Sequence, residues 1–449
     1  MVKLMEENSR KKKKDLIASR IYFLFQTGFF HIFGSSVVNK LISFMSTIVL
    51  VHILTKSEYG TFTYSWNIYG IIMLFNGLAL ESAVLQVCCE HAGDTDYSIR
   101  ISGFCMRTGL TYDLFISVVI VVIAFFVPLK IEGARVVLFY TVLLPEISLI
   151  LNISISYLRT QKRNLFYSGI TLFNTFLLFI CQSGGTLLFR EKGIIWGYYI
   201  SGIITFFVLF FVSSDVRCIL KNIKTRSVDG CKALFSIGAV SMINNGIAQM
   251  MYLLDVFVLG FVTSNGAVLA GYKVATVIPT ALTFIPASFV TYIYPYFAEH
   301  RMDGKWCLVQ YKKILKYIGL MNLVISMTLI LLASRIVPFV FGRQYDDPET
   351  IAIFRLLSFN YFFSGTFRTI AGNLLVTQRK LKFNTFVAIV SGFLNVIGDF
   401  FFINIFGARG AAYVTLCVVF ISSIMNVCYL IHVFKERSSA SISQSDRTC

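Results

Sequence analysis

The stretch TQKRNLF at residues 160–166 returns as TQRKLKF at residues 377–383, an offset of 217 residues. Each copy joins two long apolar segments. The same offset aligns Lys192-Gly193 with Arg409-Gly410, and each of these pairs precedes another apolar segment. Chance rarely supplies two matches in one register at equivalent places. The second half of the chain is therefore predicted to repeat the first.

Working outward from these turns, the chain divides into twelve apolar segments. About 20 apolar residues suffice for a helix to cross a hydrocarbon core of ~30 Å. Hydrophobic residues make up 56% of the chain, charged residues only 14%, and the mean hydropathy is +0.73. We therefore predict an all-α polytopic membrane protein of about 12 transmembrane helices. The predicted spans are 34–54, 61–87, 109–127, 135–158, 165–189, 193–213, 234–262, 270–297, 314–333, 351–376, 383–404 and 410–433.

Six spans in each half give both halves the same orientation, so they form parallel repeats with a central cleft between two lobes. This is the architecture of a transporter that works by alternating access. The predicted organisation is a basic or interfacial segment at 1–33, a first lobe at 34–213, a cytoplasmic linker at 214–233, a second lobe at 234–433 and a polar tail at 434–449.

The net charge of +17 follows membrane topology and does not indicate nucleic-acid binding. With the N-terminus inside, the predicted cytoplasmic segments carry most of the 40 Lys and Arg, which is the positive-inside pattern. Both termini are then expected in the cytoplasm. No Cys falls in a predicted external loop, so no disulfide framework is expected. The sequence contains no phosphate-binding G-x-x-x-x-G-K-[ST] loop and no metal-ligand spacing, and we expect no catalytic residues, cofactor or metal.

Ionisable residues within the predicted spans are functional candidates, because burying a charge in a membrane costs several kcal/mol unless it is paired or wet. Arg368 has no acidic residue at its depth in the predicted spans of its own lobe, which favours a water-filled cleft. Arg355 and Asp399 lie near the predicted interface, where they can snorkel to water. The remaining candidates are Lys40, Glu81, Glu146, Asp255 and Lys273.

Two readings of these charges stay open. Lys40 with Glu81, and Asp255 with Lys273, lie at matching depths and can be ion pairs within their lobes. Alternatively, the cations attract an anionic substrate, and Arg in particular suits phosphate through bidentate contacts. Pro279 and Pro286 in the eighth span either let that helix bend during gating or kink it permanently.

Three motifs resemble those of polysaccharide-export flippases. LTKSEYG at 54–60 is similar to an L-x-x-x-x-Y-G turn after the first span, and DVFVLG at 255–260 followed by AGYKVA at 270–275 is similar to a D-x-x-x-L-G … G-x-Y-x-x-A pattern. With the basic turns and twelve spans, the resemblance covers nearly the whole chain. The family is that of the Wzx-type oligosaccharide flippases within the MATE-like MOP superfamily.

The resemblance implies that an undecaprenyl-pyrophosphate-linked oligosaccharide moves from the cytoplasmic to the outer leaflet of a bacterial inner membrane, for O-antigen, capsule or exopolysaccharide. It implies headgroup contacts for Lys40, Lys273 and Arg368, and ion coupling through Glu81, Glu146 or Asp255. A polysaccharide polymerase and chain-length proteins are possible partners.

Two other functions are weaker. A cation-coupled multidrug or small-molecule antiporter would favour carboxylates in the cleft over Lys40 and Arg368. A membrane-embedded polysaccharide polymerase would need a large external loop, which the sequence lacks.

Overall fold

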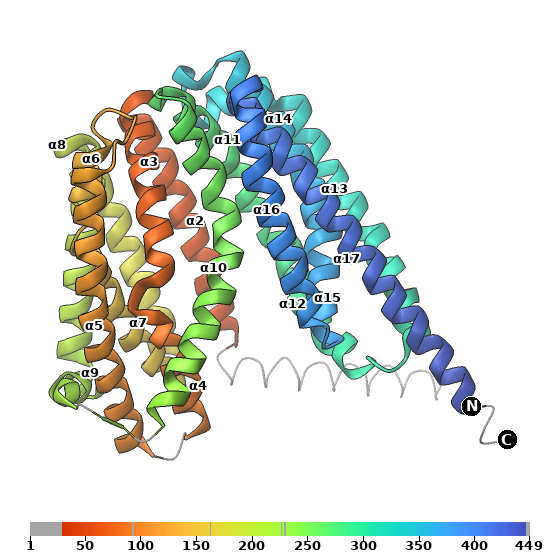
Figure 1. Ribbon diagram of the computed structural model, residues 1–449, viewed down its shortest axis with the longest axis horizontal. Coiled ribbons are helices and arrows are strands. Elements are labelled where there is room, and N and C mark those ends of the chain that lie inside the picture. The colour runs from red at the N-terminus through yellow and green to blue at the C-terminus, as the bar shows by residue number, and fades with distance from the viewer. Residues whose placement is uncertain (1–28, 92–93, 162, 226, 229, 446–449) are drawn as a thin grey trace, which may run out of the picture. The chain divides into compact units, whose positions relative to one another are not determined.

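The computed structural model describes residues 29–91, 94–161, 163–225, 227–228 and 230–445 (Figure 1). Helices dominate this part of the chain, and no strand occurs in it. Large apolar side chains remain exposed on the long helices, for example Phe126 at 80%, Leu331 at 72% and Phe339 at 88%. Within the described ranges, eight helical stretches are long and apolar enough to cross a membrane. The predicted polytopic membrane fold is confirmed. The predicted segment 1–33 lies almost entirely outside the described residues.

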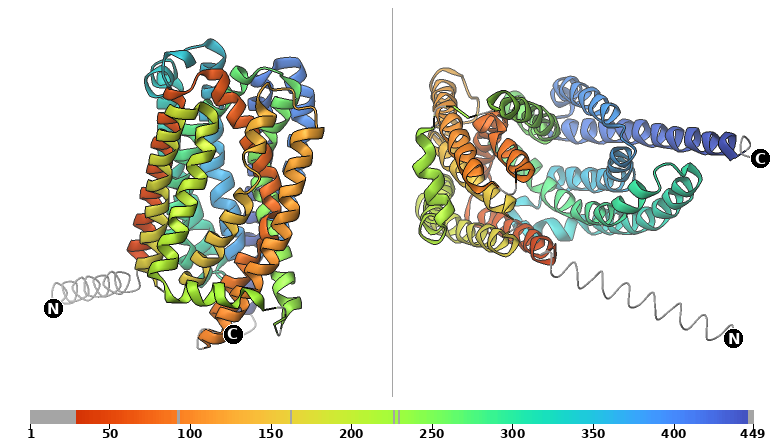
Figure 2. Two further views of the ribbon diagram at one scale, coloured as in Figure 1. Left: turned by 90° about the vertical axis from the view of Figure 1, so that its left-hand side faces the viewer. Right: turned by 90° about the horizontal axis from the view of Figure 1, so that it is seen from below.

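The chain packs into two compact units, and the first takes in described residues up to 47, 75–119 and 141–242. Apolar side chains of α4, α5, α7, α9 and α10 form one of its cores around Leu80, Met106 and Tyr157. Its long helices run side by side, and the short α9 lies across their ends (Figure 2). Its elements are α2 (Phe29–Ile53, first part), η1 (Met73–Ala79, from Phe75), α4 (Leu80–Glu90), α5 (Thr95–Phe126, most of it), α7 (Leu144–Thr160), α8 (Asn164–Val212), α9 (Ser214–Lys221), η2 (Asn222–Lys224) and the start of α10 (Cys231–Val262).

The second unit takes in residues 48–74, 120–140 and the described chain from 243 onward. One of its cores gathers Phe297, Tyr311, Leu374 and Phe434 from α12, α13, α15 and α17. Besides the remainders of α2, α5 and α10, its elements are α3 (Lys56–Ile72), α6 (Ala134–Phe139), α11 (Gly266–Leu282), α12 (Phe284–Glu299), α13 (Gly304–Phe341), η3 (Arg343–Tyr345), α14 (Pro348–Phe363), the π-helical turn η4 (Ser364–Arg368), α15 (Thr369–Thr377), α16 (Leu381–Phe406) and α17 (Ala408–Ser445). The unit boundaries differ from those of the predicted lobes, and the lobes stay a prediction.

Several predicted spans are broken helices. Span two changes direction at Gly77, Leu78 and Ala79, all with positive φ, and span four is split between α6 and α7. Span eight is divided at Thr283, between Pro279 in α11 and Pro286 in α12. Such breaks in membrane helices are tolerated where neighbouring groups satisfy the freed backbone atoms.

The internal repeat is visible in the backbone. Both basic turns follow a helix that ends at a Thr, and the hydroxyls of Thr160 and Thr377 each donate to the carbonyl three residues earlier at 2.7 Å. Farther along, Arg190 has φ 54° and ψ −136°, and Gly407, at the same offset of 217, has φ 61° and ψ −142°. This conformation is nearly restricted to glycine.

The helical segments before and after this turn approach each other in the same way in both halves. The Gly185 carbonyl oxygen lies where a Cβ of Gly193 would be, and the Phe402 carbonyl oxygen lies where a Cβ of Gly410 would be. Both pairs keep the offset of 217 residues. The repeat predicted from the sequence therefore extends to local geometry that sequence identity does not reveal.

Candidate functional site

A buried carboxylate on α10 is the centre of the second unit's polar cluster. Asp255 is 7% exposed and accepts hydrogen bonds from three neighbouring helices. The hydroxyls of Tyr272 on α11 and Thr415 on α17 donate to Oδ2 at 2.7 and 2.6 Å, and Asn395 Nδ2 on α16 donates to Oδ1 at 3.0 Å. Donors from three neighbouring helices thus converge on one carboxylate.

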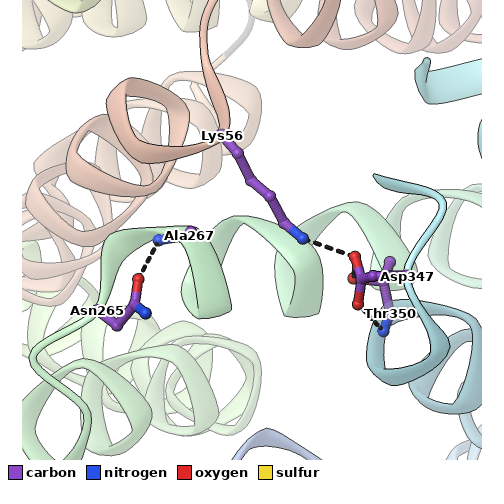
Figure 3. Close-up of polar contacts among 5 residues, drawn as sticks. All are labelled: Lys56, Asn265, Ala267, Asp347 and Thr350. Carbon is purple, nitrogen blue, oxygen red and sulfur yellow. Dashed lines mark hydrogen bonds and ion pairs between the residues drawn. The ribbon is translucent and has the colours of Figure 1, made fainter. Parts of the chain in front are cut away.

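The motifs DVFVLG at 255–260 and AGYKVA at 270–275 explain how Asp255 and Tyr272 come into contact. The turn after α10 ends at Asn265, whose Oδ1 accepts from the Ala267 N–H at 2.9 Å and so begins α11 (Figure 3). A short turn between antiparallel helices places residues at equal distances from it at the same depth. DVFVLG and AGYKVA lie on the two sides of this turn, so the Asp of the first faces the Tyr of the second.

A second carboxylate, Asp399, lies one helical turn after Asn395 and is fully buried. It is close enough to Asp255 for their charges to interact. Within the described chain, no N–H or hydroxyl group donates to either Asp399 oxygen, which leaves the Asp255 carboxyl group as its hydrogen-bonding neighbour, and Asn395 Oδ1 also accepts no hydrogen bond. The expectation that Asp399 snorkels to the interface is wrong, because Asp399 is fully buried and Asn395, one turn earlier on α16, contacts Asp255 on α10.

These oxygens are chemically suited to hold a small cation or a proton. Two buried carboxylates repel one another unless a proton or cation lies between them. Carboxylate, amide and hydroxyl oxygens are ligands that hard cations prefer, and the cluster offers no Cys or His ligand for a transition metal. Asp255, Asn395, Asp399 and Thr415 would hold such an ion, and a proton shared by the two carboxyl groups would meet the same need. We call these four residues the cation cluster.

Arg368 opens onto the same cavity as Asp255. The cavity has a volume of about 100 Å³ and lies wholly within the second unit. The structure thus brings together three residues that the sequence singled out separately: Asp255, Pro279 and Arg368. Further lining residues are Tyr272, Thr276, Thr280, Thr283, Leu357, Asn360, Tyr361, Ser364, Asn395, Thr415, Val418 and Val419.

A π-helical turn orients Arg368. Residues Ser364–Arg368 insert an extra residue into the helix, a feature common at functional sites. Asn322, fully buried on α13, donates from Nδ2 to Thr366 Oγ1 at 3.1 Å and accepts from the Tyr361 hydroxyl at 2.9 Å. These contacts fix the turn on both sides. No sequence pattern predicted this turn.

The other predicted candidates are more scattered. Lys273 interacts electrostatically with Asp255, but no ion pair of Lys273 within 4 Å is found among the described residues. In the first unit Lys40 is exposed on α2, while Glu81 lies in the first turn of α4 and buries Oε2. Glu146 accepts from the Ser117 hydroxyl at 2.7 Å. The roles predicted for these four residues remain predictions.

Sequence reasoning missed Asp113, a fully buried carboxylate of the first unit. It accepts from the Gly77 N–H at 2.7 Å and from Asn76 Nδ2 at 2.9 Å, and Asn76 Nδ2 also lies 3.1 Å from the Pro145 carbonyl oxygen. Asp113 therefore satisfies the backbone freed where span two breaks, which is a structural role. The signal was available, because Asp113 is a lone acid in an apolar stretch of α5.

A second contact network joins α2, α3 and α14 at the other resemblance motif. The Lys56 ammonium forms an ion pair with Asp347 Oδ2 at 2.6 Å, and Asp347 Oδ1 accepts from the Thr350 N–H at 2.8 Å (Figure 3). Gln344 Nε2 donates to the Val51 carbonyl at 2.8 Å. Burial opposes ionisation of Asp347, but the hydrogen bonds from Lys56 and Thr350 outweigh it and hold its pKa below the usual value.

Comparison with known families settles the class of protein. The sequence profile described as "Polysaccharide biosynthesis protein" matches residues 49–348. The chain belongs to this family. The predicted relationship to the polysaccharide-export flippases is thereby confirmed. A comparison with the curated proteins gives no match.

Solved structures confirm the MATE-like fold of this polysaccharide biosynthesis protein. It is similar to an inward-facing multidrug resistance MATE family transporter of the MOP superfamily, with a TM-score of 0.70, 15% identity, and coverage of 90% of this chain and 96% of that chain. It is also similar to lipid II flippase MurJ, with a TM-score of 0.66, 15% identity, and coverage of 92% of this chain and 90% of that chain. For a MOP superfamily transporter from Pyrococcus furiosus the TM-score is 0.57 and the identity 14%, with coverage of 92% of this chain and 96% of that chain.

Proposed function

We propose that the protein is a flippase that moves a polyprenyl-pyrophosphate-linked oligosaccharide from the inner to the outer leaflet of a bacterial cytoplasmic membrane. The observation that carries this proposal is the shared cavity of Arg368 and Asp255. Membership of the polysaccharide biosynthesis family supports a glycan-linked substrate, and the fold supports transport.

Arg368 serves the anionic headgroup. Its planar guanidinium makes paired hydrogen bonds to phosphate oxygens, and the low dielectric of a membrane cavity strengthens them. Sugar hydroxyls then meet the neutral polar groups of the same cavity, such as Asn360 and Tyr361. The polyprenyl tail stays in the bilayer, where the exposed apolar side chains of the long helices face it.

The cation cluster couples transport to an ion gradient. With a cation or proton bound, Asp255 and Asp399 can remain close together on α10 and α16. Without one, their repulsion favours separation of these helices. A ligand shifts such an equilibrium only through its different affinity for the two arrangements, and this repulsion supplies the difference. Because α11 and α14–α15 line the same cavity, the change reaches the headgroup contact at Arg368.

A cation-coupled small-molecule antiporter is the second candidate. It is favoured by one observation: a carboxylate, Asp255, lines the cavity, and a carboxylate suits a cationic substrate. Arg368 on the same wall disfavours such a substrate.

Deleting the gene in its host tests the function directly. If the chain is the flippase, intact lipid-linked repeat units accumulate in the inner leaflet and surface polysaccharide is lost. Single units accumulating in the outer leaflet would indicate polymerisation instead. Unchanged lipid-linked sugars with altered drug sensitivity would indicate multidrug export. The test also identifies which polysaccharide is affected, with its polymerase and chain-length partners, and fusions at both ends test the predicted cytoplasmic termini.

A further inference from the structure

The first unit carries a separate cavity at the inner end of α5. It has a volume of about 420 Å³ and is lined by Phe104, Arg107, Thr108, Thr111 and Thr225. The lining combines one cation, three hydroxyl groups and one aromatic ring, and it contains no acidic residue. The Thr111 hydroxyl donates to the Thr108 carbonyl oxygen at 2.8 Å and would have to rotate to donate to a ligand. This composition suits a phosphate group, which needs a positive charge and hydrogen-bond donors.

The linker before α10 completes this cavity. The η2 turn packs so closely on α5 that a Cβ on Gly103 would lie 2.7 Å from the Asn222 carbonyl oxygen. Thr225 follows directly, with its N–H donating to Asn222 O at 3.0 Å. Arg107 Nη1 donates to the Thr225 carbonyl oxygen over a long distance of 3.5 Å. Among the described residues, this is the one hydrogen bond that the Arg107 guanidinium makes. The remaining donors of Arg107 are available to a ligand.

The cavity also lies at the depth of phospholipid headgroups. On α5, the side chains of Leu114, Phe115 and Val118 are 58–61% exposed, which marks the start of the lipid-facing surface. Arg107 precedes Leu114 by seven residues, or about 10 Å along a helix that rises 1.5 Å per residue. The predicted topology places this end of α5 at the cytoplasmic face, where Lys221 and Lys224 of the linker are exposed.

We propose that Arg107, Thr108, Thr111 and Thr225 form a binding site for the phosphate group of an anionic lipid at the inner leaflet. This inference rests on the proposed function: the site captures the diphosphate headgroup of the substrate before the headgroup reaches Arg368 in the second unit. The chemistry selects a phosphate or diphosphate and is indifferent to the sugars.

A photo-crosslinking experiment localises the binding. The full-length protein in phosphatidylcholine nanodiscs is irradiated with a diazirine-bearing farnesyl diphosphate, and labelled peptides are mapped by mass spectrometry. We expect label within residues 95–118 or 221–228, with about a tenfold loss in Arg107→Gln, because an Arg–phosphate contact is lost. Arg107→Lys keeps the charge and retains part of the labelling. Arg100→Gln is the matched control: it removes an exposed cation two turns away on the same helix and leaves labelling unchanged.

Competition separates the two sources of phosphate. Inhibition of labelling by inorganic pyrophosphate means that the anion alone is recognised, whereas labelling that resists it means that the lipid tail is also required. Equal labelling of these peptides in the wild type and Arg107→Gln would overturn the site. So would equal losses in Arg107→Gln and Arg100→Gln. The gene deletion tests the proposed function independently. If the deletion shows a flippase but Arg107→Gln labels like the wild type, only the proposed Arg107 site is rejected.

Discussion

The two halves of the chain differ in charge at equivalent interior positions, and the clearest case is Gln182 in the first unit and Asp399 in the second, 217 residues apart. Gln182 is 4% exposed, its Oε1 accepts from the Ser46 hydroxyl at 3.1 Å, and its side chain also bonds the Tyr198 hydroxyl. Asp399 is fully buried, and among the described residues its hydrogen-bonding neighbour is another carboxyl group, that of Asp255. The first site is neutral and satisfied, whereas the second needs a proton or a cation.

Two other pairs of equivalent positions also differ between the two halves. Tyr198 corresponds to Thr415, whose smaller side chain donates its hydroxyl to Asp255 Oδ2 at 2.6 Å. Leu151, 7% exposed, corresponds to Arg368. The repeated turns show that both halves keep one scaffold, while the charges on the cavity occur in the second half. The two halves therefore share backbone geometry at the turns and differ in charge at a few interior positions.

Removing the second-half carboxylate should have the largest effect. Asp399→Asn keeps the size of the side chain but abolishes one charge, so the cation has one carboxylate ligand fewer. We expect loss of surface polysaccharide and of the response to an ion gradient, with normal protein in the membrane. Asn426→Asp, another buried amide in the second unit, tests the opposite change at an unrelated place. Wild-type polysaccharide from Asp399→Asn would contradict the coupling role.

Removing the positive side chain of Arg368 should reduce surface polysaccharide nearly as much. Arg368→Ala deletes the proposed headgroup contact, and surface polysaccharide should disappear while the protein remains in the membrane. Arg368→Lys keeps the charge without the planar fork, and partial activity is expected. Asn322→Leu releases the π-helical turn and should lower activity without altering the charge. Unchanged polysaccharide in Arg368→Ala would remove Arg368 from the substrate path.

The reciprocal substitution sharpens the comparison. Gln182→Glu places a carboxylate where the first unit offers Ser46 and Tyr198 but no second acid within their cluster. We expect destabilisation on the order of 3 kcal/mol, because an unpaired charge is buried. Thermal unfolding of the purified protein measures this effect, with Gln182→Met as the neutral control. If sodium ions restore the stability of Gln182→Glu, the first half can also hold a cation and the contrast fails.

The ion pair of the second unit gives a smaller and pH-dependent effect. Because the pKa of Asp347 is lower in the folded chain than the usual value near 4, folding favours its ionised form. The stabilisation is therefore complete above about pH 4 and is lost as the pH falls through the lowered pKa. Asp347→Asn should lower the melting temperature equally at pH 6 and pH 8, and the difference should shrink in acid. A difference that grows in acid would contradict this assignment.

The shared scaffold itself predicts the smallest effect. Arg190 adopts a conformation that glycine holds at the equivalent position 407. Arg190→Gly should relieve strain of about 1 kcal/mol and raise the melting temperature by roughly 2 °C. Lys192→Gly, two residues away, is the control and should not stabilise. A lower melting temperature for Arg190→Gly would show that its side-chain contacts outweigh the backbone strain.

Much of the fold followed from the sequence, because hydrophobic length and a constant offset are linear properties. The polytopic helical fold and the internal repeat were predicted in this way. Asp255 and Arg368 were singled out separately, as charges within apolar segments, and the sequence did not predict that they line one cavity. Depth along a span was predictable, but the face of the helix was not, and this is why Asp399 was placed at the interface. Asn395 and Thr415 are neutral and give no signal until three helices bring them to one carboxylate.

The measurement that tests the central claim most directly is flipping of lipid-linked oligosaccharide in proteoliposomes under an imposed sodium or proton gradient. The wild type should respond to one of these gradients, Gln182→Met should respond in the same way, and Asp399→Asn should not respond. An Asp399→Asn protein that flips with an unchanged gradient dependence would contradict cation coupling through the second-half cluster.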